Sequence, residues 1–387
     1  MKEYVKIPAL FMRGGTSKGV YLDLADLPTD QGIRDQVILD IYGSPDARQI
    51  NGMGGADPLT SKVALLDQSA REGIDVDYTF GYVGINDAHV DYEGNCGNIS
   101  SGVGIYAILK GWVLPSAPLT KVRIYNTNTK KVIVAEIPTA ENGEVITMGG
   151  YSIDGVAGSG ARIDLNFLNS GGSKTGKLLP TGNLKDQITL SSGKVIEASL
   201  VDAANPAIFV RAEDIGLTGC ELPSDCANHP EIVEILDDIR TTGAVLMGLA
   251  KSKEEAGPAV PKVAMVSSPK DHTCSDGRLI QAGECDLIAR TLALGVLHKA
   301  YAVTGGICVA TAALLPGTVV NDLVAERAKE TGVVRLAHPS GLLDFAIGLE
   351  KQSDGKWHLE KAGVSRTARL IMEGQVFVTR SVYEGKR

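Results

Sequence analysis

A single thiol, Cys96, lies in a turn rich in glycine and asparagine, GNCGN, directly before an apolar segment that ends near Gly111. The segment carries almost no charged side chain, which predicts a helix buried on all sides. Cys96 would then lie at the helix N-terminus, where Gly97 and Asn98 offer free N–H groups. The helix dipole favours an anion there, such as a thiolate or a bound carboxylate. An inert cysteine that packs as a small apolar residue is the alternative.

Lys62 ends a second glycine-rich polar segment, RQINGMGGADPLTSK, and precedes the apolar strand Val63–Leu66. Burial disfavours an ammonium ion, so a partly buried lysine at this position can act as a base. A solvated lysine at a strand edge is the alternative.

A third segment of this kind, RGGTSKG, follows the strand predicted at Val5–Met12 and precedes a strand at Val20–Leu24. We expect a loop here whose N–H and hydroxyl groups, including the hydroxyl of Ser17, suit an anion. The alternative is a plain glycine turn.

The elements that must position these residues are mostly short strands. A helix is predicted from Thr29 or Asp30, as N-cap, to Gly43. The first half is therefore β-structure around one buried helix. A boundary is placed at residue 182, which gives domains 1–182 and 183–387, with the last strand able to return to the first domain. The second half repeats the plan, with helices predicted near Pro230–Thr241, Asp286–Leu297 and, entered by a second glycine turn, Thr304–Pro316.

Composition narrows the function classes. The chain has 387 residues and a formal net charge of −8, which argues against nucleic acid or an anionic membrane as a partner. No signal peptide or membrane-spanning run is visible, and six cysteines without a C-x-x-C pair indicate reduced thiols in the cytoplasm. The segment SGGSKTGK has P-loop spacing, but Leu178 follows it where a hydroxyl must reach magnesium, so we reject a nucleotide site. No metal, haem, flavin or nicotinamide motif is present, and we expect no cofactor.

Eight motifs from Met12 to Val378 resemble the PrpF family in type and order, which covers nearly the whole chain. They are MRGGTSKG, INGMGGADPLTSK, DYEGNCGNISSGVG, LPTGN, VDAANPAIFV, LPGTVVN, AHPSG and SRTARLIMEG. That family includes 2-methylaconitate cis–trans isomerase, 3-methylitaconate Δ-isomerase and 4-oxalomesaconate tautomerase. The Lys62 and Cys96 segments look closest to the methylitaconate branch.

The resemblance implies an α+β, diaminopimelate-epimerase-like fold. Two similar domains would each wrap a β-barrel-like sheet around a central buried helix, with the active site in the cleft between them. It further implies that Lys62 and Cys96 are catalytic and that Ser17 lines the same site. The partner would be a small di- or tricarboxylate, and a homo-oligomer is left open. We expect substrate contacts from N–H groups or side chains at both helix entrances and from one later loop: Ser17, Gly97, Asn98, Thr304, Gly305, Gly306 and Ser340.

Two rival functions remain open from the residues. A racemase or epimerase of an amino or hydroxy acid would need a second reactive thiol, but Thr304 occupies the mirrored position and Cys308 is interpreted as core. A carboxylate-binding protein without catalysis would give Lys62 and Cys96 no required role. We expect His338 to order its Pro-Ser-Gly turn, and Arg366 and Arg369 to pair with surface acids rather than with substrate.

Overall fold

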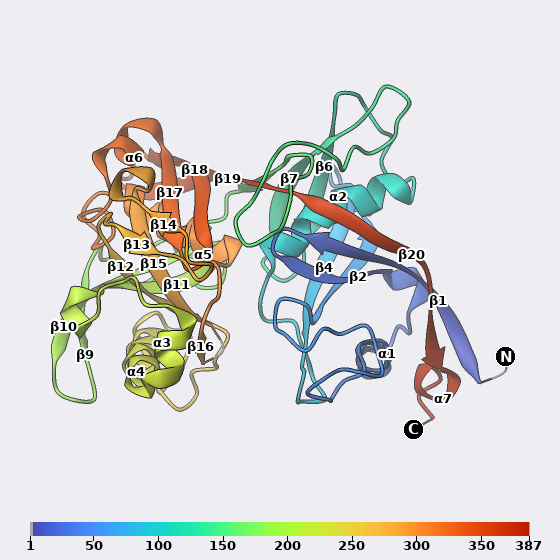
Figure 1. Cartoon of the computed structure of the whole chain (residues 1–387), viewed down its shortest axis with the longest axis horizontal. Helices are drawn as coiled ribbons and strands as arrows, with labels where there is room; N and C mark the ends of the chain where they lie inside the picture. The colour runs from blue at the N-terminus through green and yellow to red at the C-terminus, as the bar shows by residue number, and fades with distance from the viewer. Residues whose placement is uncertain (1–2, 294, 387) are drawn as a thin grey trace. The chain divides into compact units, whose positions relative to one another are not determined.

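The computed structural model describes residues 3–293 and 295–386, which form two compact units (Figure 1). The first unit comprises Met1–Leu165 together with Ser365–Arg387, and the second comprises Asn166–Val364. The units divide after Leu165 and again before Ser365, so that β20 (Ala368–Thr379) belongs to the first unit. Among the described residues, no helix has the length and apolar character needed to cross a membrane.

The first unit is a sheet in which the first strand of the chain, β1, pairs with the last strand, β20. β20 pairs antiparallel with β1, β1 with β2, β3 with β4 and β6 with β7, whereas β2–β3 and β4–β6 are parallel. Its strands are β1 (Tyr4–Gly14), β2 (Ser17–Asp23), β3 (Lys62–Gln68), β4 (Val76–Val83), β5 (Val90–Asp91), β6 (Leu119–Asn126), β7 (Lys131–Pro138), β8 (Ile163–Leu168), which runs into the second unit, and β20 (Ala368–Thr379).

Helix α2 (Gly97–Leu109) lies inside this sheet and contacts β1, β2, β3, β4, β6, β7 and β20 (Figure 1). Every residue from Gly97 to Ile108 is buried, as the absence of a charged face predicts. Gly111 follows the C-cap Lys110 with a positive φ of 73°, the C′ position expected for glycine.

Helix α1 (Gln31–Tyr42) covers another face of the first unit with the short helix α7 (Arg380–Tyr383). The Asp30 carboxylate caps it by accepting from the Ile33 N–H at 2.9 Å, and Gly43 ends it in the left-handed conformation. Its apolar face joins a core that includes Val20, Val63 and Val378. The cap and the end are as predicted.

The second unit repeats the arrangement around α5 (Val303–Leu314), which contacts β10, β11, β17 and β18. Helix α4 (Pro230–Leu246) packs against β9, β11, β12 and β15 over a separate apolar core. The other elements are β9 (Asp186–Thr189), β10 (Val195–Ala203), β11 (Asn205–Arg211), β12 (Lys262–Ser267), β13 (His272–Thr273), β14 (Leu279–Ile280), β15 (Leu287–Ala293), β16 (Val296–Leu297), β17 (Val333–His338), β18 (Gly341–Lys351), β19 (Trp357–Arg366), α3 (Pro223–Asn228) and α6 (Glu326–Thr331). Three short 3₁₀ helices cover Leu24–Asp26, Glu213–Ile215 and Ala282–Glu284.

The helix predicted near Asp286–Leu297 is wrong, because β15 occupies this segment. Leu287–Ala293 pairs antiparallel with β12 and parallel with β17, and its first six residues are buried. A strand covered on both sides has no polar alternation, so its short apolar sequence cannot be distinguished from a buried helix by period.

The rejected P-loop segment folds around an internal carboxylate. Asp202, which is fully buried, accepts hydrogen bonds from the backbone N–H groups of Ser173, Lys174 and Thr175 at 3.0, 2.9 and 2.7 Å. The hydroxyls of Ser173 and Thr175 donate to the same carboxylate. Successive N–H groups of this kind form an anion-binding concavity, and Asp202 already fills it.

Candidate active site

Ser17 and Lys62 lie on neighbouring parallel strands of the first unit. The predicted loop RGGTSKG is mostly strand, since β1 and β2 pair from Leu10 to Tyr21 and only Gly15 and Thr16 form the turn. Ser17 is thereby the first residue of β2, and Lys62 is the first residue of β3. Gly19 is opposite Lys62, where an added Cβ would lie 2.0 Å from the Lys62 carbonyl oxygen. Only glycine permits this approach, which fixes the start of β3.

Cys96 is the N-cap residue of α2, and its side chain is 8% exposed. Lys62 Nζ donates to Ser17 Oγ at 2.9 Å and contacts Cys96 Sγ at 3.6 Å, and Cys96 Sγ lies 3.9 Å from Ser17 Oγ. Three separate elements thus bring an amine, a thiol and a hydroxyl together. Lys62 is half-buried and Ser17 is 1% exposed, so the cluster is largely shielded from water.

Two buried tyrosines hold the first turn of α2. The Tyr21 hydroxyl donates to the Ile99 carbonyl at 2.7 Å, and the Tyr78 hydroxyl donates to the Cys96 carbonyl at 3.4 Å. Burial raises the pKa of both phenols, and negative charge on Cys96 raises it further. Both hydroxyls therefore stay protonated and act as fixed donors beside the thiol.

The start of α2 presents backbone donors at the predicted residues. The first bond along the helix runs from the Ser100 N–H to the Cys96 carbonyl at 3.1 Å, so the N–H groups of Gly97, Asn98 and Ile99 precede the helical pattern. The Asn98 side chain is engaged in the fold, because Nδ2 donates to Thr16 Oγ1 at 3.0 Å and Oδ1 accepts from the Thr16 N–H at 3.4 Å. Asn98 thus ties the β1–β2 turn to the helix entrance.

Gly15 is required at that contact. Its φ is 52°, and an added Cβ would lie 2.1 Å from Asn98 Oδ1. A side chain here would strain the turn and push it away from the helix.

The entrance of α5, in the second unit, differs from that of α2. Its N-cap is Ala302, so Thr304 and Gly305 lie inside the first turn, and both are buried. The Gly306 N–H donates to the Ala302 carbonyl at 2.8 Å. The helix therefore already uses the Gly306 N–H, and the predicted contact of Gly306 with substrate stays a prediction. The predicted substrate contacts of Thr304 and Gly305 stay predictions.

Cys308 is a core residue, as expected. Its side chain is 0% exposed and Sγ donates to the Val201 carbonyl at 3.3 Å. Burial raises the pKa of this thiol well above its ordinary value. It therefore stays neutral, and the first two turns of α5 offer no reactive thiol.

Ser340 lies in the turn between β17 and β18, in the second unit. Its hydroxyl donates to the Lys299 carbonyl at 2.5 Å, and its N–H donates to His338 Nδ1 at 3.2 Å. His338 orders the turn as expected, and the Ser340 hydroxyl proton is used within the fold. Its contact with substrate stays a prediction.

The expectation that Arg366 pairs with surface acids is wrong. Arg366 is 3% exposed, and its one hydrogen bond among the described residues runs from Nη1 to the Ser365 carbonyl at 3.0 Å. Nε is buried without a partner. Arg369, three residues further along the chain, is exposed. Arg366 ends β19 and Arg369 lies near the start of β20, so their different burial depends on how the two strands pack, which the sequence did not supply.

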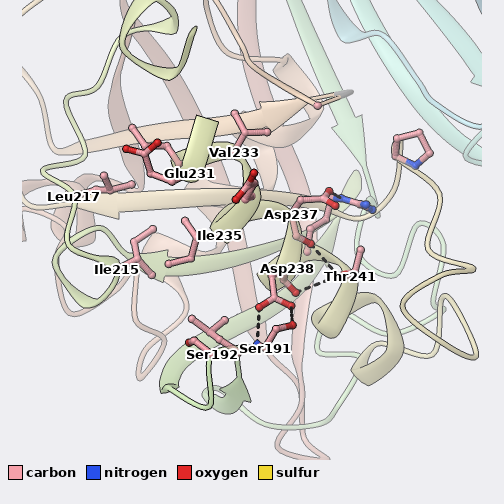
Figure 2. A pocket seen from close by; sticks show the side chains of 16 residues that line it. Ser191, Ser192, Ile215, Leu217, Glu231, Val233, Ile235, Asp237, Asp238 and Thr241 are labelled. Atoms are coloured by element: carbon pink, nitrogen blue, oxygen red, sulfur yellow. Dashed lines mark hydrogen bonds and ion pairs between the residues drawn. The ribbon is translucent and has the colours of Figure 1, made fainter. Parts of the chain in front are cut away.

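A separate groove in the second unit runs along α4 and is lined by acidic and apolar side chains, among them Glu231, Ile235 and Asp237. Figure 2 shows Asp238 turned toward Ser191, whose N–H and hydroxyl donate to its carboxylate at 2.7 and 2.8 Å. None of the predicted site residues lines this groove. Within the described residues, no group of three or more His, Cys, Asp or Glu side chains is placed to hold a metal ion.

A family model described as PrpF protein matches residues 4–379 of the chain. The chain belongs to the PrpF family. It is 45% identical over 385 residues to a 3-methylitaconate isomerase of Eubacterium barkeri, covering 98% of this chain and 99% of that protein. It is 40% identical over 390 residues to a 2-methyl-aconitate isomerase of Cupriavidus necator, with 97% of each chain covered.

Solved structures agree with this assignment. A methylitaconate-delta-isomerase structure matches this PrpF chain with a TM-score of 0.84 and 44% identity, over 98% of this chain and 97% of that one. A hydroxyproline epimerase from Agrobacterium vitis matches with a TM-score of 0.55 at 14% identity, over 97% and 93% of the two chains, which concerns the fold alone. The predicted diaminopimelate-epimerase-like α+β fold is confirmed.

Proposed function

We propose that this isomerase of the PrpF family moves a carbon–carbon double bond in a small unsaturated dicarboxylate of the methylitaconate type. The observation that carries the proposal is the contact of Lys62 Nζ with both Ser17 and Cys96 at the entrance of a buried helix. The higher identity to a methylitaconate isomerase than to a methylaconitate isomerase favours this substrate.

Shifting an allylic double bond needs one proton removed from carbon and one returned to a different carbon. A neutral Lys62 amine would take the first proton and become an ammonium ion. The Cys96 thiol would give its proton to the second carbon and become a thiolate. The ammonium ion then returns a proton to the thiolate across the 3.6 Å contact. The cycle balances with no redox step and restores both groups.

The intermediate is a dienolate whose extra negative charge spreads into a carboxylate. The N–H groups of Gly97 and Asn98 lie at the positive end of the α2 dipole, where they would stabilise that charge. Ser17 Oγ accepts from Lys62 and from Cys96, which leaves its own hydrogen to donate to a substrate oxygen.

Proton NMR of the purified protein in D₂O with methylitaconate, methylaconitate and oxalomesaconate tests the proposal. Isomerisation of methylitaconate with solvent deuterium entering the product, and its loss in Lys62→Ala, is the expected result. Turnover that survives unchanged in Lys62→Ala would remove the lysine from the mechanism. Turnover of only one of the other two acids would keep the reaction class and replace the substrate. A wild-type protein that exchanges no proton with any of the three acids would overturn the function.

A further inference from the structure

Arg366 is a buried cation that has no acidic partner within residues 3–293 and 295–386. It is the last residue of β19 and is 3% exposed, and none of these residues accepts a hydrogen bond from its Nε. The single bond from Nη1 goes to the carbonyl of the preceding residue, Ser365. A guanidinium carries five N–H donors, so most of its hydrogen-bonding capacity is unused here.

An isolated buried charge is costly, and proteins that bury an arginine usually pair it with a carboxylate or a phosphate. Burial lowers the pKa of Arg366 to about 10, against the opposing effects of Tyr151 and Cys96. The side chain is therefore still a cation at neutral pH. A fold that keeps such a cation unpaired is consistent with an anion that arrives from solution.

The backbone beside Arg366 is fixed to the entrance of α2. The Thr367 carbonyl accepts from the Gly15 N–H and from Arg13 Nη1, both at 2.9 Å. Gly15 and Thr16 form the β1–β2 turn, which Asn98 holds against the first turn of the helix. Arg366 thus directly precedes a backbone group that is hydrogen-bonded to the turn at the entrance of α2, and negative charge on Cys96 raises the pKa of its guanidinium.

We propose that Arg366 binds one carboxylate of the substrate, while the N–H groups at the start of α2 receive the second carboxylate or the charge that develops from it. The inference rests on the proposed function in taking the ligand to be a dicarboxylate. A guanidinium fork matches the two oxygens of a carboxylate, so it holds the acid in one orientation. Two separate anion-binding elements explain why a diacid, rather than a monoacid, fits this entrance.

The test compares wild type with Arg366→Met and Arg366→Lys, with Arg369→Gln as the matched control in the same segment. The binding probes are 2,3-dimethylsuccinate, a saturated analogue of methylitaconate, and its monoamide, which has the same shape and one charge fewer. Calorimetry gives the dissociation constants, and thermal unfolding without ligand reports on stability.

Wild type is expected to bind the diacid more tightly than the monoamide. Arg366→Met is expected to weaken diacid binding roughly tenfold to a hundredfold, the range for hydrogen bonds to a charged group, and to abolish the preference over the monoamide. Arg366→Lys should recover part of the affinity for the diacid and part of the preference over the monoamide. Arg369→Gln should bind both probes as wild type does. Without ligand, Arg366→Met should unfold at the same or a higher temperature than wild type, because it removes an unpaired buried charge.

An unchanged preference for the diacid in Arg366→Met would overturn the inference, and so would wild type binding neither probe. A lower unfolding temperature of Arg366→Met without ligand, with diacid binding unchanged, would assign the arginine to the fold alone. Loss of the preference in a protein whose wild type turns over none of the three acids would keep this binding role and reject the proposed isomerisation. The two failures are therefore distinguishable.

Discussion

The two units share a backbone arrangement with a lysine at the same position, but the side chains around that lysine differ. In the first unit, a tight turn joins β1 to β2, and β2 runs parallel to β3 with Gly19 opposite Lys62. In the second unit, a tight turn joins β10 to β11, and β11 runs parallel to β12 with Ala207 opposite Lys262. The second strand of each parallel pair, β3 in the first unit and β12 in the second, begins with the sequence Lys-Val-Ala.

The side chains around the repeated lysine differ. Ser17 lies two residues before Gly19, the residue opposite Lys62. The equivalent residue in the second unit, two residues before Ala207, is Asn205. The buried helix has Cys96 as its N-cap in the first unit and Ala302 in the second. A repeated backbone therefore does not repeat the cluster of amine, hydroxyl and thiol, which come from three elements of the first unit.

The largest difference between the two units is expected when each lysine is replaced by alanine in a separate variant. Lys62→Ala is expected to lower the turnover rate by about 10² to 10⁴, the usual contribution of a positioned proton-transfer group. Lys262→Ala is expected to change it less than about threefold, since a substitution away from such a group usually has a small effect. Initial rates by NMR with methylitaconate measure both. Equal losses in the two variants would show that the second strand pair also contributes chemistry.

Replacing the thiol of Cys96 or of Cys308 by a hydroxyl should have different effects on turnover. Cys96→Ser is expected to lower turnover about tenfold to a thousandfold, because a hydroxyl gives up its proton far less readily than a thiol. Cys308→Ser should leave the turnover of folded protein unchanged and lower the unfolding temperature, because it places a hydroxyl in an apolar core. Equal turnover in Cys96→Ser and wild type would reduce Cys96 to a polar neighbour of Lys62.

Alkylation tests, without any mutation, whether the Cys308 thiol is inaccessible in the native protein. Burial raises the pKa of the Cys308 thiol, so iodoacetamide at neutral pH should leave it unmodified until the protein unfolds. Peptide mass mapping before and after denaturation reads this out. Modification of Cys308 in the native protein would contradict its assignment to the core.

Thr304 provides a weaker test at the second helix entrance. If its hydroxyl binds substrate, as its mirrored position at the second helix entrance predicts, Thr304→Ala should raise KM about twofold to tenfold, the value of one neutral hydrogen bond, and leave kcat nearly unchanged. A fall in kcat with KM unchanged would assign Thr304 to the chemical step. Steady-state kinetics at saturating and limiting substrate separate the two.

The smallest expected effect concerns acid stability of the second unit. His272 is buried, its Nδ1 donates to the Lys270 carbonyl at 3.0 Å, and its Nε2 has no partner in the part of the chain that the structure describes. Burial lowers the pKa of this imidazole, with further lowering by Arg290 and Lys270, while the Lys270 carbonyl and Asp271 oppose it. The unfolded chain therefore binds the proton more readily, and stability should fall as pH drops through the ordinary value of 6.5.

Denaturant midpoints at pH 5 and pH 7 measure that dependence. His272→Gln should show a smaller difference between the two pH values than wild type, with His229→Gln, at an exposed histidine, as the control. If His272→Gln shows the same difference between the midpoints at pH 5 and pH 7 as wild type, another group causes the loss of stability in acid.

Several features followed from local sequence alone. The charge-free segment after Cys96 predicted a buried helix, because no orientation of such a helix offers a polar face to water. Asp30 and Gly43 predicted the ends of α1, since capping and left-handed geometry depend on adjacent residues. The positions of Lys62 at a strand start and of Cys96 at a helix start were likewise local, and the ordered motifs gave the family.

The remaining features depended on contacts between distant segments. Leu287–Ala293 is a strand because β12 and β17 pair with it, not because of its own period. The burial of Arg366 follows from the register of β19 and from the contact of Thr367 with the β1–β2 turn. The sequence by itself determined that a lysine starts an apolar strand and that a cysteine precedes a buried helix. Only the tertiary structure placed Lys62 Nζ beside Ser17 and Cys96, because hydrogen bonding between strands far apart in sequence sets those distances.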